Sequence, residues 1–464
     1  MNAKVSVILP SLNVAAYIRE CLESVVNQSL RELEIICIDA GSTDGTEEIL
    51  KKYAAKDSRI TLLRSNVKSY GRQVNMGLDY AKGEYVAVLE TDDWIAEDMY
   101  RRLYNQAVRD RLDYAAADFE TFFQLQNGYG YFTRQHIFPD RKWTSKATEK
   151  RPGRDWYGKV LGSGEIAALR SSDYTLWRGI YNREFLNVNK IRFHESLGAA
   201  FQDMGFLQQV KTCAERAEYL DESFYRYRQG REAASSACLE GLRYYEGEFR
   251  WLDEQRALLQ ELEGDHKRYY YLTMSIAFLS KYEQVLSGLR GDWQDERLAR
   301  PYGWFQQHIS HAVDSGLLNE KIYGEGQWER LTLLLSSQEN HARMAAAKEK
   351  EKEKPVQEFL AMTNKCPVVI FGCGIRGERL MLFCDRNQVK ILGFSDNNRV
   401  LQGRKKFGFP VIPPEELADM AEKRNLAVVL SMKEGAAQVR GQLVKLGMKA
   451  EQVIDRLPAG IFNH

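Results

Sequence analysis

The sequence predicts an α/β protein with two separate sheets joined by a helical region. Three observations lead to this prediction: strand and helix patterns alternate over the first part of the chain, helix patterns dominate the middle, and the alternation resumes after Cys366. Strand, helix, strand in this rhythm favours parallel sheets covered by helices on both faces. The chain has 464 residues, which is enough for about three domains.

The first α/β unit begins with the apolar run at residues 5–9, which Pro10 ends. Further apolar runs predict strands at residues 33–38, 60–63 and 85–89. Between them, apolar side chains recur at helical spacing. The segment therefore predicts a parallel sheet with helical crossovers.

The middle of the chain has a different pattern. Residues 99–236 are less regular and rich in aromatic side chains, which leaves two interpretations open: a wall of a substrate site, or core filling under long loops. Residues 239–335 are mostly of helical type, and their apolar positions are expected to pack helices together. The charged run at 345–354 has strong helix formers and no apolar face, which predicts a solvated helical linker.

A second α/β unit follows the linker. Its first predicted strand, at residues 368–371, runs into the pattern G-x-G-x-x-G formed by Gly372, Gly374 and Gly377, and Asp396 comes at the end of the next strand. This pattern is typical of dinucleotide-binding units, so these four residues are candidates for nucleotide binding. Only about 100 residues are available, with no second half to hold nicotinamide. We therefore favour an assembly role first, then a sugar-nucleotide or other regulatory ligand, and NAD or NADP last.

The overall composition excludes several classes of protein. Lys and Arg number 65 against 64 Asp and Glu, a net charge of +1, which lacks the basic footprint of a nucleic-acid binder. Seven cysteines without a C-x-x-C pair predict reduced thiols rather than a disulfide frame or a zinc site. The first strand begins close to Met1 and no long apolar window follows, so we expect neither a signal peptide nor a membrane span. The expected location is the cytoplasm, with docking on the inner membrane face left open.

Acidic side chains follow two strands of the first unit. Asp39 comes directly after the second strand, and Glu90, Asp92 and Asp93 come directly after the fourth. Since ligands of parallel sheets bind outside the carboxyl ends of the strands, we expect both sites to face one crevice. Clustered carboxylates repel one another without a cation, and Mg²⁺ or Mn²⁺ typically binds one or two of them together with substrate phosphates. The pattern predicts a metal-bridged nucleoside diphosphate, with an acid-rich helix start as the structural alternative.

Three segments of the first unit carry a family resemblance. They are V-S-V-I-L-P-S-L-N at 5–13, I-D-A-G-S-T-D-G-T at 38–46 and N-M-G-L-D-Y-A-K-G-E-Y-V-A-V-L-E-T-D-D-W at 75–94. In order and spacing they resemble the nucleotide-sugar half of inverting family 2 glycosyltransferases, which have the GT-A fold with a mixed, mainly parallel sheet. The resemblance implies sugar transfer from a nucleoside-diphosphate donor, UDP-sugar favoured, to a glycan or lipid-linked glycan. The implied pathway is bacterial surface polysaccharide synthesis, of capsule or lipopolysaccharide.

The resemblance also implies roles for single residues. It implies nucleotide-sugar binding by Pro10, Leu12, Asn13, Asp39, Tyr70, Arg72 and Asp92. Asp39 would accept a hydrogen bond from the pyrimidine ring, and Asp92 would hold the ribose or the sugar. Asp93 would ligate the metal ion, Mn²⁺ or Mg²⁺, that bridges the diphosphate. Ala40 and Glu90 are mild departures, because the family often has Asp at both positions.

Cationic side chains near the phosphates are harder to assign. Val74 stands where many members of the family have Arg, so Lys68 or Arg72 would take over that phosphate contact. Arg226 and Arg228 are alternate residues of an extended segment and are expected to point to opposite sides. At most one of them would then reach the site, and the other would form a structural ion pair.

The general base is expected in the second half of the catalytic unit. The resemblance continues through residues 180–186, 191–206 and 225–231, and a carboxylate of the middle segment serves as base in the family. Asp203 is the matching residue, with Glu195 as the second candidate. His194, beside Glu195, is expected to be a hydrogen-bonding residue of the wall.

These predictions divide the chain into three parts. We expect a GT-A catalytic domain at 1–237, a helical region with a charged linker at 238–355, and a Rossmann-like, nucleotide-binding-like domain at 356–464. The last resembles small domains appended to some bacterial surface-sugar enzymes. The alternatives are a non-catalytic sugar-nucleotide scaffold or sensor, and an NAD(P)-dependent oxidoreductase that uses the C-terminal domain. A homo-oligomer is left open.

Overall fold

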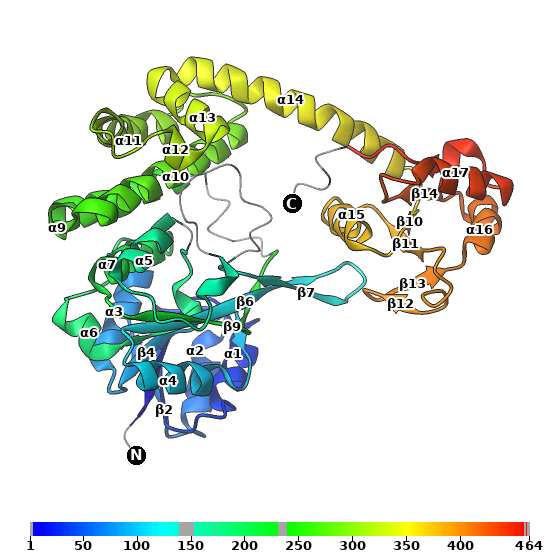
Figure 1. The fold of residues 1–464 in the computed structure, drawn as a ribbon. Coiled ribbons are helices and arrows are strands. Elements are labelled where there is room, and N and C mark those ends of the chain that lie inside the picture. Colours follow the sequence, from blue (N-terminus) through cyan, green and yellow to red (C-terminus); the bar gives the residue numbers. More distant parts are fainter. Residues whose placement is uncertain (1–2, 139–152, 172, 231–238, 459–460, 462–464) are drawn as a thin grey trace. The chain divides into compact units, whose positions relative to one another are not determined.

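The computed structural model describes residues 3–138, 153–171, 173–230, 239–458 and 461 (Figure 1). It has two compact units. The first comprises Met1–Phe122 and Phe132–Ala342, and the second comprises Phe123–Tyr131 and Arg343–His464. The helical region thus groups with the first unit, while the predicted boundary after residue 237 lies outside the described residues.

The first unit is built on a nine-stranded mixed sheet, which confirms the predicted α/β class. Its strands, in pairing order, are β3 (Ile60–Arg64), β2 (Leu33–Asp39), β1 (Val5–Ser11), β4 (Tyr85–Val88), β8 (Gly179–Asn182), β6 (Tyr114–Gln124), β9 (Ala217–Arg228) and β5 (Trp94–Ile95), with β7 (Gly130–Gln135) paired to β6. The first four strands are parallel. β8 is antiparallel to both of its neighbours, as is β5 to β9.

Helices cover both faces of this sheet because successive strand residues face opposite sides. Val5, Val7 and Leu9 of β1 belong to one buried cluster, and Ile8 belongs to a second cluster on the other face. The helices of the α/β part are α1 (Ile18–Val26), α2 (Thr46–Ala54), α3 (Tyr70–Tyr80), α4 (Met99–Asp110), α5 (Ser163–Ala168), α6 (Arg183–Val188) and α7 (Gln202–Cys213). The strand runs are thus buried on both sides, as their continuous apolar sequence predicts.

The helical region of the first unit follows β9. Its helices are α8 (Gly241–Arg250), α9 (Leu258–Glu261), α10 (Gly264–Gly288), α11 (Glu296–Asp314), α12 (Glu320–Tyr323) and α13 (Glu325–Ser336). α14 (Gln338–Thr363) contains the charged run at 345–354, so the predicted linker is helical. Among the described residues, no helix has both the length and the apolar character that a membrane span requires.

The second unit contains a smaller sheet. Its strands, in pairing order, are β12 (Lys405–Lys406), β13 (Phe409–Ile412), β11 (Ile391–Ser395), β10 (Val368–Phe371), β14 (Ala427–Leu430) and β15 (Val453–Ile454), with helices α15 (Ile375–Arg386), α16 (Leu417–Arg424) and α17 (Ala436–Lys445). All pairs except β12–β13 are parallel. Residues 123–131, the tip of the β6–β7 hairpin, also belong to this unit.

The sheet order of the first unit places the candidate residues along one edge. Ser11, at the end of β1, is in register with Asp39 at the end of β2, and Ile8 of β1 is in register with Val88 of β4. The segments that follow β1, β2 and β4 therefore emerge at the carboxyl edge of the parallel strands. This edge is where open α/β sheets bind their ligands.

Candidate active site

In the carboxylate of Asp39, one oxygen accepts hydrogen bonds and the other does not. Its Oδ2 accepts hydrogen bonds from the backbone N–H groups of Gly41, at 2.9 Å, and Ser42, at 3.0 Å. Its Oδ1 is buried and has no hydrogen-bond partner among the described residues. A buried acceptor without a donor is costly in a folded protein. The side chain is thus oriented by its own loop and offers one oxygen to an N–H donor.

The loop after β1 is tied to the loop after β2. Asn13 adopts the left-handed region, with φ 54°, and its Oδ1 accepts a hydrogen bond of 2.9 Å from the backbone N–H of Thr43. The Asn13 backbone N–H donates to the hydroxyl of Ser42 at 2.9 Å. Pro10 is buried, whereas Leu12 is exposed at the surface. The structure therefore brings Pro10, Leu12, Asn13 and Asp39 to one edge of the sheet.

The acidic loop, residues Glu90–Asp93, is buried except for part of Glu90. The hydroxyl of Tyr70 donates to Glu90 Oε1 at 2.5 Å, so this predicted residue lies beside the loop. Asp93 Oδ2 accepts from the hydroxyl of Tyr225 at 2.8 Å, and its Oδ1 accepts from the backbone N–H of Arg228 at 2.7 Å. Burial raises the pKa of Asp93 well above its usual range, and the charge of Asp92 raises it further.

A pocket of about 210 Å³ joins the acidic loop to the predicted base. Its lining comprises Tyr70, Glu90, Asp92, Asp93, Trp177, Ala199, Ala200, Phe201, Gln202, Asp203 and Tyr227. Four residues predicted from the sequence therefore meet here, although they come from three separate segments of the chain: Tyr70, Asp92, Asp93 and Asp203. The loop after β4 and the start of α7 both contribute to the lining.

Asp203 lies in the first turn of α7. Burial raises its pKa to about 6, and its Oδ1 accepts a hydrogen bond of 2.9 Å from the backbone N–H of Met204. The preceding residues form a tight loop. Phe201 is in the left-handed region with φ 66°, and the buried side chain of Gln202 bonds back to the backbone N–H of Ala200 at 2.7 Å and to the hydroxyl of Ser196 at 2.8 Å. This loop fixes where α7 begins.

The second base candidate lies outside the pocket lining. Glu195 is exposed, accepts a hydrogen bond from the amide of Asn75 at 3.0 Å, and pairs with Arg72 at 3.4 Å. Arg72 therefore has a carboxylate partner. The Nδ1 atom of His194 lies 2.8 Å from Oε1 of the buried Glu248. Lys68 is exposed and, like these residues, is absent from the pocket lining.

The expectation for Arg226 and Arg228 was wrong in its geometry. Residues two apart on a strand share a face, and both guanidinium groups lie over the same aromatic cluster: Arg226 over Phe132 at 5.7 Å and Arg228 over Phe122 at 5.3 Å from the ring centroid. Arg226 forms the expected structural ion pair, 2.7 Å from Glu120. Arg228 instead contacts the acidic loop.

Trp177, Gln202 and Tyr227 are among the lining residues that sequence reasoning did not assign to the site. Trp177 is stacked on Tyr225, with ring centroids 4.1 Å apart, and on Tyr227, at 5.3 Å. Trp177 and Tyr227 both line the pocket, together with Gln202. The sequence signal was weak: Trp177 is one of many aromatic residues in the irregular segment, and Tyr227 alternates with Tyr225 in a strand that was not predicted in detail.

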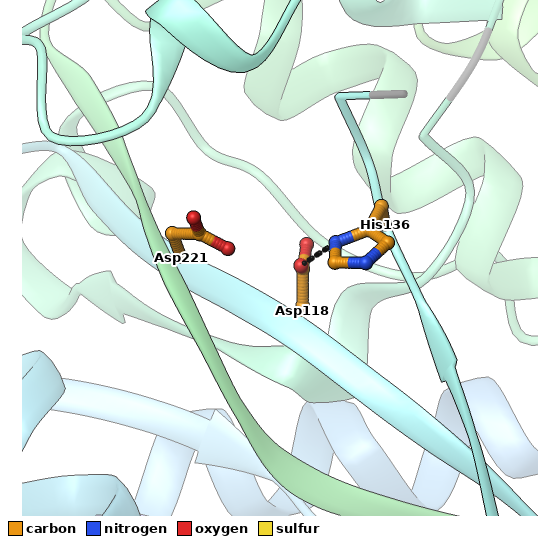
Figure 2. Close-up of side chains that lie close together, drawn as sticks. All are labelled: Asp118, His136 and Asp221. Carbon is orange, nitrogen blue, oxygen red and sulfur yellow. Dashed lines mark hydrogen bonds and ion pairs between the residues drawn. The ribbon is translucent and has the colours of Figure 1, made fainter. Parts of the chain in front are cut away.

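A group of potential metal ligands lies elsewhere in the first unit. Asp118, His136 and Asp221 each offer one ligand atom, all within 4.8 Å of one another (Figure 2). However, His136 Nδ1 is 2.7 Å from Asp118, Arg134 is 3.0 Å from Asp118, and Arg154 is 2.8 Å from Asp221. Arg134 also pairs with Asp221. Since two guanidinium groups already neutralise the carboxylates, we assign this group to a structural ion-pair network.

A larger groove lies at the opposite edge of the sheet. It has a volume of about 1060 Å³ and is lined by the amino ends of the strands, including Lys4 and Glu34. Three of its charged groups already have partners: Lys4 pairs with Glu32 at 2.8 Å, and Glu34 accepts from the hydroxyl of Ser6 at 2.6 Å and from the backbone N–H of Lys82 at 2.8 Å. Parallel sheets bind ligands at the carboxyl edge, so the smaller pocket is the better candidate for an active site.

The predicted nucleotide-binding residues of the second unit lie together after β10. Gly372 has φ +106°, and a Cβ at Gly377 would lie 1.9 Å from the Gly372 carbonyl oxygen, so both positions need glycine. A Cβ at Gly374 would meet open space. Asp396 Oδ2 accepts a hydrogen bond of 2.8 Å from the backbone N–H of Cys373. Nucleotide binding by this loop stays a prediction.

Comparisons with known proteins agree with this geometry. Residues 6–176 match the family model of glycosyl transferase family 2. The uncharacterized glycosyltransferase YibD of Escherichia coli K12 is 34% identical over 224 residues, which are 48% of this chain and 61% of that protein. Glycosyltransferase GlyG of Streptococcus pneumoniae serotype 4 is 26% identical over 230 residues, 49% of this chain and 72% of that protein. The chain thus spans less than two thirds of the YibD protein.

Solved structures show the same fold. The crystal structure of Staphylococcus aureus TarS 1-349 superposes with a TM-score of 0.52 and 20% sequence identity, covering 75% of this chain and 91% of that one. The family match begins in β1 and ends in η4 (Leu176–Arg178), and it includes the loops that carry Asp39 and the acidic residues. The match to glycosyl transferase family 2 over residues 6–176 and the fold shared with TarS 1-349 agree with the predicted GT-A fold of the first unit.

Proposed function

We propose that this protein is a glycosyltransferase that moves a sugar from a nucleoside-diphosphate donor to a glycan acceptor with inversion at the anomeric carbon. The observation that carries the proposal is that Asp92, Asp93 and Asp203 line the same pocket. A donor diphosphate at the acidic loop would place its sugar toward α7. An acceptor hydroxyl near Asp203 would then attack from the side opposite the leaving group.

The donor's nucleoside would bind at the edge formed by the loops after β1 and β2. The buried, unpartnered Oδ1 of Asp39 is suited to the ring N–H of a uracil base, because a carboxylate only accepts hydrogen bonds. The structure of TarS 1-349 in complex with UDP-GlcNAc superposes on this chain with a TM-score of 0.50. We therefore favour a UDP-sugar as donor, and Leu12 and Asn13 as neighbours of its nucleoside.

The acidic loop has the donor set of a divalent cation site. Its ligands are carboxylate oxygens, which suit Mn²⁺ and Mg²⁺, and the raised pKa of Asp93 reflects carboxylates buried side by side. Both oxygens of Asp93 already accept one protein hydrogen bond, but each carboxylate oxygen can accept a second interaction. We propose that Asp93 holds the ion and that Asp92 holds the ribose or sugar. The ion would neutralise charge on the leaving diphosphate.

Asp203 would remove the proton of the acceptor hydroxyl as that oxygen attacks. A general base is most effective with a pKa near the working pH, and burial brings Asp203 to about 6. Positioned acid–base groups typically contribute about 10²–10⁴-fold in rate. Trp177 and Tyr227, on the pocket wall, would limit where the acceptor ring can lie.

The wider role is proposed from the relatives. Their names include glycosyltransferase GlyA of Streptococcus pneumoniae serotype 4 and poly(ribitol-phosphate) beta-glucosyltransferase of Bacillus spizizenii. We propose that this chain acts in the synthesis of a bacterial surface polysaccharide, on the cytoplasmic side. The division into a catalytic domain, a helical region and a C-terminal accessory domain is part of the same proposal.

A thermal-shift panel of nucleotide sugars, with and without Mn²⁺, tests the function. A ligand that binds only the native state must raise the melting temperature, so we expect UDP-sugars with Mn²⁺ to give the largest shift and EDTA to abolish most of it. Donor hydrolysis or transfer should then be lost in Asp93→Ala and Asp203→Asn. Binding without turnover by any acceptor would favour a sensor instead, and binding of NADH alone would favour an oxidoreductase.

A further inference from the structure

The acidic loop is held in place by strand β9. β5 pairs antiparallel with β9, with Trp94 opposite Arg226 and Ile95 opposite Tyr225. The residues just before β5 therefore run beside the last residues of β9. Because the acidic loop immediately precedes β5, its position depends on this pairing.

Two residues of β9 contact three of the loop's four residues. The hydroxyl of Tyr225 donates to Asp93 Oδ2 at 2.8 Å and accepts from the backbone N–H of Glu90 at 3.3 Å. The backbone N–H of Arg228 donates to Asp93 Oδ1 at 2.7 Å, and its guanidinium Nε donates to the carbonyl oxygen of Asp92 at 3.0 Å. Tyr225 thus fixes one side of the loop and Arg228 fixes the other.

Both side chains are themselves held firmly. Tyr225 is fully buried, and its ring is stacked on Trp177. The Arg228 guanidinium lies 4.6 Å from the centroid of the Trp94 ring and 2.5 Å from a carboxylate oxygen of Glu20. A planar guanidinium that stacks and donates in fixed directions cannot be replaced by the ammonium of lysine.

We propose that Tyr225 and Arg228 are positioning residues that hold the acidic loop in the geometry that binds the donor diphosphate together with its divalent cation. This inference rests on the proposed function. The neighbouring carboxylates of Asp92 and Asp93 repel each other, so without the two anchors they would spread apart. Ligand binding would then have to order the loop, and the free-energy cost of that ordering would weaken the affinity.

The test uses the full chain with Tyr225→Phe, which removes only the hydroxyl, and Arg228→Lys, which keeps the charge. The probe is Mn²⁺, titrated calorimetrically into protein saturated with UDP. We expect each variant to bind Mn²⁺ about tenfold more weakly. Tyr225→Phe loses the two hydrogen bonds of the hydroxyl to Asp93 and Glu90, and Arg228→Lys loses the guanidinium bond to the carbonyl oxygen of Asp92. UDP affinity without metal should change much less. Excess Mn²⁺ should restore the transfer rate, which a general loss of structure would not allow.

Arg226→Lys is the matched control. Arg226 lies on the same strand but pairs with Glu120, so we expect wild-type Mn²⁺ affinity. Unchanged Mn²⁺ affinity in both test variants would overturn the positioning role while leaving the proposed function intact. If the wild-type protein with UDP binds no Mn²⁺, the cation part of the proposed function fails and the positioning role falls with it. Circular dichroism identifies a misfolded variant, in which case the other variant decides.

Discussion

At the scale of single residues, the carboxylate of Asp203 faces the pocket from the first turn of α7. We predict that Asp203→Asn lowers the transfer rate by about 10²-fold or more, because the amide cannot take the acceptor's proton. Donor binding should stay within about twofold of wild type. The measurement is a steady-state assay paired with a UDP titration. Weak donor binding by the variant would show that Asp203 acts in donor recognition instead.

The pH dependence follows from the pKa of about 6 that burial gives Asp203. The base is active when ionised, so kcat/KM should fall as the pH drops through 6 and level off above 7. The stability effect has the opposite sign: a raised carboxyl pKa means that the wild-type fold loses stability as the pH rises from about 4 through about 6. Asp203→Asn should therefore melt no lower than wild type at pH 8. A flat rate profile between pH 5 and 7 would refute this assignment.

Asp39 gives a second prediction at this scale. Asp39→Asn would replace an acceptor oxygen by an amide that cannot accept both from the loop and from a nucleobase. We expect a 10- to 100-fold loss of UDP affinity, about 1–3 kcal/mol, which is typical of a buried hydrogen bond to a charged group. Calorimetric titration of UDP measures it. Equal affinity of the variant and the wild type would place the nucleobase away from Asp39.

Single residues could be predicted from the sequence where a strand end or a family motif fixed them. Asp39 and Asp92 follow short apolar strands, and the rule for parallel sheets was enough to place them at one edge. Gln202 and Tyr225 could not be predicted, because their partners depend on a loop conformation and on the β5–β9 register. The prediction that Arg226 and Arg228 point to opposite sides was wrong because residues two apart share a face of a strand.

At the scale of elements, helix α3 approaches the segment before α7 very closely. A Cβ at Gly71 would lie 1.9 Å from the backbone carbonyl oxygen of His194. We predict that Gly71→Ala destabilises the first unit by about 1–3 kcal/mol or more, because backbone cannot yield as a side chain can. It should also displace Tyr70 and weaken donor binding. Denaturant unfolding and a UDP titration measure the two effects.

Gly247→Ala is the control for that prediction. Gly247 lies inside α8, and a Cβ there would meet nothing within 4 Å. Alanine is favoured over glycine within a helix by about 1 kcal/mol, so this variant should be slightly stabilised. If both variants unfold alike, the close approach of α3 to His194 does not contribute to stability.

The elements themselves were predictable where their pattern was regular. Apolar runs located β1, β2 and β4 to within two residues, because these strands are buried on both faces. β6 and β9 were not resolved from the sequence: their residues mix aromatic, charged and small side chains, and burial varies irregularly along each strand. Irregular burial leaves no period to detect.

At the scale of the whole molecule, the two units are not consecutive along the chain. Residues 123–131 lie within the sequence of the first unit but belong to the second. Leu125 and Tyr131 are members of the buried cluster that contains Ile370 of β10 and Phe394 of β11. The amide of Asn127 also donates to the carbonyl oxygen of Phe407 at 3.0 Å. A linear division from composition could not find this insertion, because the hairpin tip has no boundary signal.

This arrangement predicts which unit a core substitution weakens. Leu125 is buried in the second unit. Leu125→Ala should therefore lower the free energy of unfolding of that unit by about 2–5 kcal/mol, as other truncations in a hydrophobic core do. UDP with Mn²⁺ should raise only the melting temperature of the first unit, because a ligand stabilises the unit that binds it. Differential scanning calorimetry, with and without ligand, assigns the two transitions. Val444 is exposed on α17 and serves as the control. Val444→Ala should change the free energy of unfolding of either unit by no more than about 0.5 kcal/mol. If Leu125→Ala instead lowers the melting temperature of the transition that the ligand raises, the hairpin tip is stabilised by the first unit.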